Sequence, residues 1–148
     1  MSTARPEGQP GTTRRHRRHH ELTFPPGATG SCISTGRDFV AHILEGAQGA
    51  HLPLDQAAAD DAALVAVELL ANAADHAGGP RELDVDLTDT DLTIAVADAS
   101  PFPPRPVFPH RADRIRGHGL HIVDQLSLSW GHFPTATGKT VWARLPRR

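Results

Sequence analysis

One stretch of this chain restricts the possible folds more than any other. Residues 55–77 are rich in alanine and leucine, begin with Asp55, which can cap a helix, and are followed by Gly78, Gly79 and Pro80. These signals predict a helix over residues 55–77 that ends at the glycines. A helix with a broad apolar face must bury that face against a second layer, which the rest of the chain has to supply.

Three polar residues within this helix, Glu68, Asn72 and His76, follow one another at intervals of four. Their line lies about 60° around the helix axis from the apolar line that begins at Val65. The polar side chains therefore border the buried face, at the edge of the helix layer, where a ligand can bind. A half-buried carboxylate there needs a compensating partner. The alternative to a ligand site is an ordinary amphipathic helix whose polar residues fall in register by chance.

Strand patterns supply the second layer. In residues 81–98, apolar and polar residues alternate in two runs around a Thr-Asp-Thr-Asp turn, which predicts an antiparallel hairpin with one buried face. Other patterns predict strands at 21–26, 126–133 and 139–145 and helices at 34–48 and 118–127, the first helix capped by Ser34 or Thr35. The expected fold class is α+β: a two-layer α/β sandwich with helices on one face of a mostly antiparallel mixed sheet.

Two segments fall outside this pattern. Residues 1–20 are rich in Pro, Gly, Thr, Arg and His and have no apolar period, which predicts a disordered basic tail before a single domain over residues 21–148. Residues 99–117 hold five prolines and no period. A loop longer than about 12 to 15 residues inside a compact domain is usually functional or disordered.

Composition excludes several kinds of protein. Seventeen acidic and 15 basic residues give a formal net charge of −2, so there is no overall attraction to nucleic acid. No apolar run reaches the roughly 18 to 20 residues of a membrane span, and no apolar segment follows the basic N-terminus as it would in a signal peptide. Cys32 is the single cysteine, which excludes an intrachain disulfide and suits a cytoplasmic protein.

Two further places carry residues that suit ligand binding. Asp98 ends an apolar strand just before the long loop, where a carboxylate can accept a hydrogen bond from a ligand amino group. Gly117 and Gly119 precede a predicted helix. Glycines there let backbone N–H groups approach a phosphate, and the helix N-terminus favours negative charge.

These places, in this order, resemble the motifs of the ATPase family that includes gyrase, the Hsp90 chaperones, histidine kinases and the mismatch-repair MutL proteins. Glu68 and Asn72 match its helix motif E-x-x-x-N, Asp98 matches its strand-end aspartate, and residues 117–120 match its G-x-G-L motif. The resemblance covers residues 22–146 and implies a Bergerat-type ATP-binding fold.

A closer resemblance is to the small bacterial anti-sigma-factor serine kinases, in particular their actinomycete members. In these a histidine follows the asparagine by four residues, as His76 does here, and residues 130–146 are also similar. In one respect the chain differs from the family. The strand-end motif is usually Asp-x-Gly, and Ser100 stands at the glycine position.

The resemblance implies roles for the motif residues. Asn72 would hold Mg²⁺, which bridges the nucleotide phosphates, and Glu68 would be the general base that activates the attacking hydroxyl or water. Asp98 would accept a hydrogen bond from the adenine amino group, and the proline-rich loop would act as a lid. The remaining nucleotide-binding residues would be Gly117, Gly119, Leu120 and Thr140.

The implied function is that of a cytoplasmic ATP- and Mg²⁺-dependent protein serine/threonine kinase and anti-sigma factor. It would bind a sigma factor and phosphorylate a serine on an antagonist protein, and so regulate transcription without contacting nucleic acid or membrane. Homodimers are in keeping with this branch. Ser100 leaves open a non-catalytic module that binds ATP or sequesters a partner. A sensor-kinase fragment is disfavoured because no dimerisation hairpin is present.

Three other motifs do not carry a function. The run HELT at 20–23 resembles a phospho-acceptor box, but Pro25 and Pro26 prevent the helix that it needs. The run GKT at 138–140 lacks the first glycine of a Walker A loop and leads into a strand. A zinc site is disfavoured because no cysteine or recognised spacing accompanies the candidate ligands His110, His118, His121 and His132.

Overall fold

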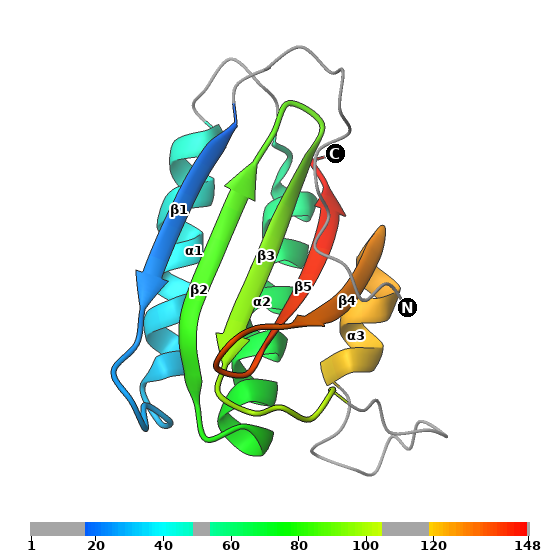
Figure 1. Ribbon diagram of the computed structural model, residues 1–148. Helices are drawn as coiled ribbons and strands as arrows, with labels where there is room; N and C mark the ends of the chain where they lie inside the picture. Colours follow the sequence, from blue (N-terminus) through cyan, green and yellow to red (C-terminus); the bar gives the residue numbers. More distant parts are fainter. Residues whose placement is uncertain (1–16, 49–53, 105–118, 148) are drawn as a thin grey trace, which may run out of the picture.

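The helices and strands follow the predicted order along the chain. The computed structural model describes residues 17–48, 54–104 and 119–147 (Figure 1). Its elements are β1 (Arg18–Thr23), α1 (Cys32–Gln48), α2 (Gln56–His76), β2 (Pro80–Leu87), β3 (Asp91–Asp98), α3 (Gly119–Leu126), β4 (Ser129–Pro134) and β5 (Lys139–Pro146).

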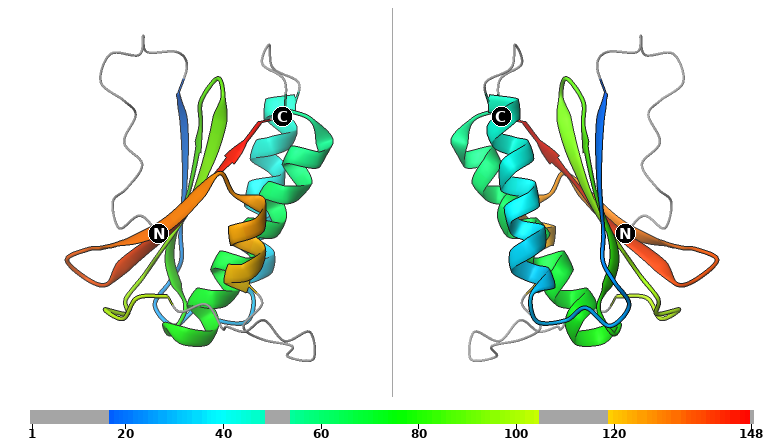
Figure 2. Two further views of the ribbon diagram at one scale, coloured as in Figure 1. Left: turned by 90° about the vertical axis from the view of Figure 1, so that its right-hand side faces the viewer. Right: turned by 90° about the vertical axis from the view of Figure 1, so that its left-hand side faces the viewer.

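The five strands form one sheet in the order β1-β2-β3-β5-β4, and the three helices cover one face of it (Figures 1 and 2). This arrangement confirms the α+β two-layer sandwich. All four strand pairs of the described chain are antiparallel, so the mixed sheet that we predicted was wrong in that detail. The physical reason is the helix pair: α1 and α2 run in opposite directions, so the chain re-enters the sheet antiparallel to β1.

Alternation in the strands decides which face is buried. The leucine, valine and isoleucine side chains of β2 and β3 face the helices and are almost completely buried. The α2 face that covers them consists of Val65, Leu69, Leu70 and several alanines. Gly36 of α1 lies where a Cβ would overlap the Leu70 side chain, so the two helices approach closely there. None of the described helices has the length and apolar character that crossing a bilayer requires.

The predicted ends of α2 are confirmed. The Asp55 side chain caps the helix by accepting a hydrogen bond from the Ala58 N–H at 2.8 Å, and the helix ends before Gly78. The predicted caps of α1 were wrong. Ser34 and Thr35 lie inside that helix, because the Thr35 N–H already bonds the Ser31 carbonyl oxygen at 3.0 Å.

β1 begins at Arg18, inside the segment that we predicted as a disordered tail. The prediction was therefore wrong for residues 18–20, while residues 1–16 lie outside the described chain. Partners on β2 explain the earlier start: Arg17 and His19 both contact the Asp86 carboxylate. Such partners lie 69 and 67 residues away, so local composition does not reveal them.

The single cysteine is part of the packed interior. Cys32 is buried, and its thiol donates a hydrogen bond to the Thr29 carbonyl oxygen at 2.8 Å. Burial raises the pKa of the Cys32 thiol, so little thiolate is present near neutral pH. A nucleophilic role is not in keeping with this environment.

Replacing Gly79 with alanine is expected to lower the free energy of unfolding by about 2 to 4 kcal/mol. Gly79 has a φ of +104°, and a Cβ there would overlap the Ala28 carbonyl oxygen. Gly78 has a φ of +71° but open space around its Cβ position, so Gly78→Ala isolates the backbone effect, about 1 to 2 kcal/mol. Urea unfolding followed by circular dichroism measures both variants. If both variants lost the same free energy of unfolding, the overlap with the Ala28 carbonyl oxygen would not contribute to the loss in Gly79→Ala.

Candidate functional site

The polar line of α2 lies at the border of the buried helix face, as predicted. Leu69 and Ala73 are almost completely buried, whereas Glu68 and Asn72 are half-buried and His76 is exposed. An acid and an amide thus lie one helical turn apart at the edge of the core, and the exposed His76 follows them at the end of the helix.

Asp98 ends β3 as a buried carboxylate. It is in phase with the buried residues Ile94 and Val96, so its side chain lies on the helix face of the sheet, only 1% exposed. Its Oδ1 accepts hydrogen bonds from the Ser100 N–H at 2.9 Å and from Lys139 Nζ at 3.0 Å. Among the described residues, none donates to Oδ2, so this oxygen can accept a hydrogen bond from a ligand.

Lys139 is a residue of this site that sequence reasoning missed. Its side chain is 6% exposed and forms a buried ion pair with Asp98, to which the β3–β5 register brings it directly opposite. The two residues are 41 positions apart, and their pairing depends on the strand order. One signal was available: Lys139 is in phase with Val141 and Leu145, which places it on the buried face.

The turn after Asp98 accommodates Ser100 without strain. No described residue other than glycine has a positive φ, so the Asp98-Ala99-Ser100 turn does not use the backbone freedom of glycine. The Ser100 N–H donates a hydrogen bond to the Asp98 carboxylate. The Ser100 Oγ accepts a hydrogen bond from the Phe102 N–H at 3.3 Å. Backbone geometry therefore explains how a serine replaces the usual glycine here.

α3 supplies a helix N-terminus to the site. It begins at Gly119, and Leu120 is buried and anchors its first turn, next to α2. The first N–H groups of a helix have no partner within the helix and attract anions. Gly117 and the greater part of the predicted lid lie outside the described residues.

These elements meet at one end of the molecule. The C-terminal end of α2, the end of β3 and the start of α3 all lie at the lower end in Figure 1, and both views of Figure 2 agree. α2 also packs directly against β3 and α3. The elements that carry three of the predicted motifs, Glu68 with Asn72, Asp98 and Gly119, therefore meet at this end.

Thr140 does not join them. It lines a pocket of about 230 Å³ on the outer face of the sheet, together with Ala97 and Trp142. Lys139, the residue before it, and Asp98, the register partner of Lys139, project to the helix face instead. The predicted nucleotide-binding role of Thr140 has no support in this placement of its side chain.

The disfavoured histidine zinc site has no support either. His110 and His118 lie outside the described residues, while His121 lies on α3 and His132 on β4. Neither belongs to a group of three potential metal ligands within the described chain.

The donor set at the lower end of the molecule suits a nucleotide with a divalent cation. It combines a carboxylate and an amide oxygen on α2, a buried hydrogen-bond acceptor at Asp98 and the positive end of the α3 dipole. Oxygen ligands are those that Mg²⁺ prefers, usually together with substrate phosphates. The residues present therefore fit the group that the sequence motifs imply.

Comparison with known proteins agrees with this assignment. The family model for the histidine kinase-like ATPase domain matches residues 36–145. The match extends from α1 almost to the end of β5 and includes Glu68, Asn72 and Asp98. No curated protein matches the chain significantly.

Proposed function

The chain belongs to the histidine kinase-like ATPase domain family, and on this premise we propose that it is an ATP- and Mg²⁺-dependent protein serine kinase. The observation that carries the proposal is the position of Glu68 and Asn72, one turn apart on the border of the buried α2 face and in the half of this helix that leads to the end of β3 and the start of α3. Phosphoryl transfer depends mainly on positioning and charge neutralisation, which such a site can provide.

Each described site residue has a distinct part in binding. Asp98 accepts a hydrogen bond from the adenine amino group through Oδ2, while Lys139 holds Oδ1 and fixes the carboxylate orientation. The Asn72 amide oxygen is a ligand for Mg²⁺, and the N–H groups in the first turn of α3 bind phosphate oxygens. When bound, ATP would supply the phosphoryl group, and Mg²⁺ would neutralise part of the negative charge of the phosphates.

Glu68 is the general base. Its carboxylate removes the proton from the serine hydroxyl of the acceptor as the serine oxygen forms a bond to the γ-phosphorus and the bond to ADP breaks. Its half-buried position keeps it near both solvent and the metal ligand Asn72, so an acceptor side chain can reach it.

The partners proposed are a sigma factor and a small antagonist protein that carries the acceptor serine. Support for them comes from the resemblance to anti-sigma-factor serine kinases, which includes His76 and residues 130–146. With these partners the protein acts in the cytoplasm and regulates transcription through protein contacts. We propose that it does so as a homodimer.

Glu68→Gln is expected to lower the rate of phosphotransfer by about 100-fold or more, because a general base contributes about 10² to 10⁴ in rate. The substitution preserves side-chain size, so ATP affinity should stay near wild type. Transfer from γ-labelled ATP to candidate antagonist proteins measures the rate, and calorimetry measures the affinity. Asp60→Ala, an exposed acid on the same helix, is the control and should transfer normally. Undiminished transfer by Glu68→Gln would exclude Glu68 as the base.

A second candidate function is a nucleotide-binding module without kinase activity. The observation that favours it is Ser100, which stands where the strand-end motif of the family usually has glycine. In this case the wild-type chain binds ATP with Mg²⁺ in calorimetry, yet transfers no phosphoryl group to any antagonist tested. The two measurements together separate the candidates, because the kinase proposal requires both binding and transfer.

A further inference from the structure

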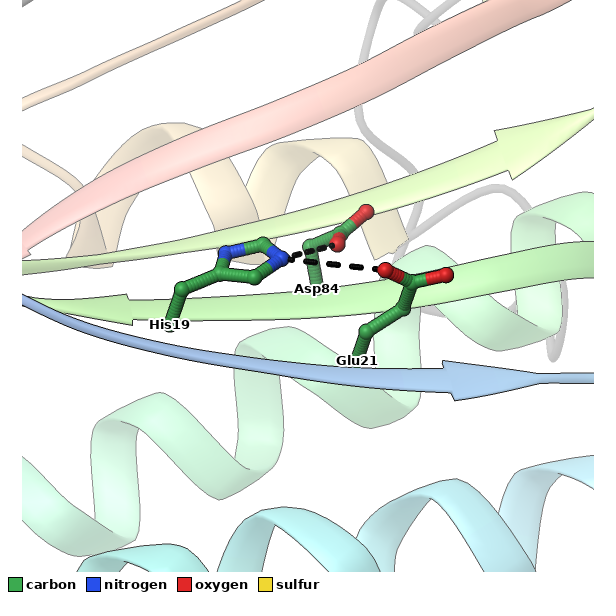
Figure 3. Close-up of side chains that lie close together, drawn as sticks. All are labelled: His19, Glu21 and Asp84. Atoms are coloured by element: carbon green, nitrogen blue, oxygen red, sulfur yellow. Dashed lines mark ion pairs between the residues drawn. The ribbon is translucent and has the colours of Figure 1, made fainter.

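A cluster of one histidine and several carboxylates lies on the outer face of the sheet, away from the helices. It lies where β1 pairs with β2: His19 is opposite Asp86, and Glu21 is opposite Asp84. The acids of β2 alternate with its buried leucine and valine side chains, so they project from the other face. Figure 3 shows three of these side chains converging from the two strands.

The spacing of three side chains suits a metal ion. His19 Nε2 lies 3.1 Å from Asp84 Oδ1 and 3.9 Å from Glu21 Oε2 (Figure 3). One ligand atom from each residue lies within 4.8 Å of the others. Tetrahedral zinc with bonds of about 2.0 to 2.2 Å places neighbouring ligand atoms about 3.3 to 3.6 Å apart. Small side-chain rotations bring the three atoms to that spacing.

The other ring nitrogen of His19 is already held. Nδ1 lies 2.8 Å from Asp86 Oδ1, and Arg17 Nε donates to the same oxygen at 3.1 Å. When Nδ1 carries the proton, it donates to Asp86 and leaves the Nε2 lone pair facing Glu21 and Asp84. Histidines that bind metals usually have this arrangement, in which a carboxylate fixes the tautomer and the ring orientation.

The electrostatics of the cluster favour a cation. The carboxylates of Asp84 and Asp86 are each 12% exposed, and Glu82 lies beside them. Arg17 and His19 are among the cations paired with these acids. A divalent ion would reduce the repulsion among the acids.

We propose that His19, Glu21 and Asp84 bind Zn²⁺. One imidazole nitrogen with two carboxylate oxygens suits zinc, whereas Mg²⁺ and Ca²⁺ prefer oxygen ligands alone. The His19 and Glu21 side chains are 41% and 48% exposed, so water can complete the coordination. The site lies on the opposite face of the sheet from Asp98 and does not depend on the kinase proposal. Bound zinc would join the edge strand β1 to β2 and stabilise the fold by mass action.

The test is calorimetric titration of the untagged full-length chain with ZnCl₂, after chelator treatment and without nucleotide. We expect one zinc ion per chain, with affinity reduced at least about tenfold in His19→Ala and in Asp84→Asn. His20→Ala is the matched control, because His20 is opposite Val85 in register and projects to the other face of the sheet. This control should bind zinc like wild type.

Several results would overturn the proposal. These are the absence of zinc binding by wild type, unchanged binding by Asp84→Asn, and an equal loss of binding in His20→Ala. Asn72→Ala should retain zinc binding, and a loss there would place the zinc in the nucleotide site instead. Glu21→Gln, an exposed position, provides a second variant if Asp84→Asn does not fold. Zinc should raise the melting temperature of wild type but not of Glu21→Gln, and an equal rise would count against the site.

Discussion

Asn72→Ala is expected to weaken ATP binding in the presence of Mg²⁺ by about 10- to 100-fold, the effect of losing one interaction with a charged group. Asn72 lies half-buried on the border of α2, and alanine is the best helix former, so the fold should be retained. Calorimetry with ATP, once with Mg²⁺ and once with EDTA, measures the effect. The loss should appear only with Mg²⁺, because the amide acts through the metal.

Two controls show whether the lost interaction is metal ligation. Asn72→Asp keeps an oxygen ligand and should retain Mg²⁺-dependent binding, apart from a like-charge effect with Glu68 of a few tenths of a kcal/mol. His76→Ala removes the exposed member of the same line and should bind like wild type. If Asn72→Ala binds ATP with Mg²⁺ as tightly as wild type does, the magnesium ligand has been assigned to the wrong residue.

Lys139→Met is expected to lower the free energy of unfolding by about 3 to 5 kcal/mol, the cost of breaking a buried ion pair by removing one partner. The Asp98 and Lys139 side chains are almost completely buried, and the substitution leaves the Asp98 carboxylate with the Ser100 N–H as its described donor. Urea unfolding followed by circular dichroism measures the change. The loss comes from an uncompensated buried charge and not from packing, since methionine is close to lysine in size.

The double variant Asp98→Asn with Lys139→Met tests this reason. Because it removes both charges, it should recover a large part of the stability lost in the single variant. Arg144→Met breaks a more exposed ion pair, with Asp91, and should cost no more than about 1 kcal/mol. A double variant as unstable as Lys139→Met would mean that the loss comes from packing or from the hydrogen bonds of Asp98.

Elements with a strong local period were predictable from sequence. The helix over 55–77 and the hairpin over 81–98 match α2, β2 and β3 within one or two residues. Their hydrophobic spacing and end residues, Asp55 and Gly78 among them, act within a few positions of the chain. The start of β1 was missed because Arg17 and His19 find their partners on β2, far along the sequence.

The site was predictable to the same degree as its elements. Glu68, Asn72 and Asp98 were identified from motif spacing, and the structure places their elements together. Their roles in catalysis and nucleotide binding stay predictions. The partner of Asp98 was not found, because Lys139 reaches it only through the β3–β5 pairing. The Thr140 side chain was assigned to the site, yet strand alternation places it on the outer face of the sheet.

Periodicity, helix ends and motif order by themselves determined the element types, the two-layer class and the family of this protein, because each element and each motif is a pattern of residues close together in the chain and the order of the motifs can be read along it. Only the tertiary structure decided the strand order, the Asp98–Lys139 ion pair and the His19 cluster on the outer face. These features join residues that are 41 to 67 positions apart. They depend on which strands pair and in which register, and the packing of the whole sheet against the helices sets both.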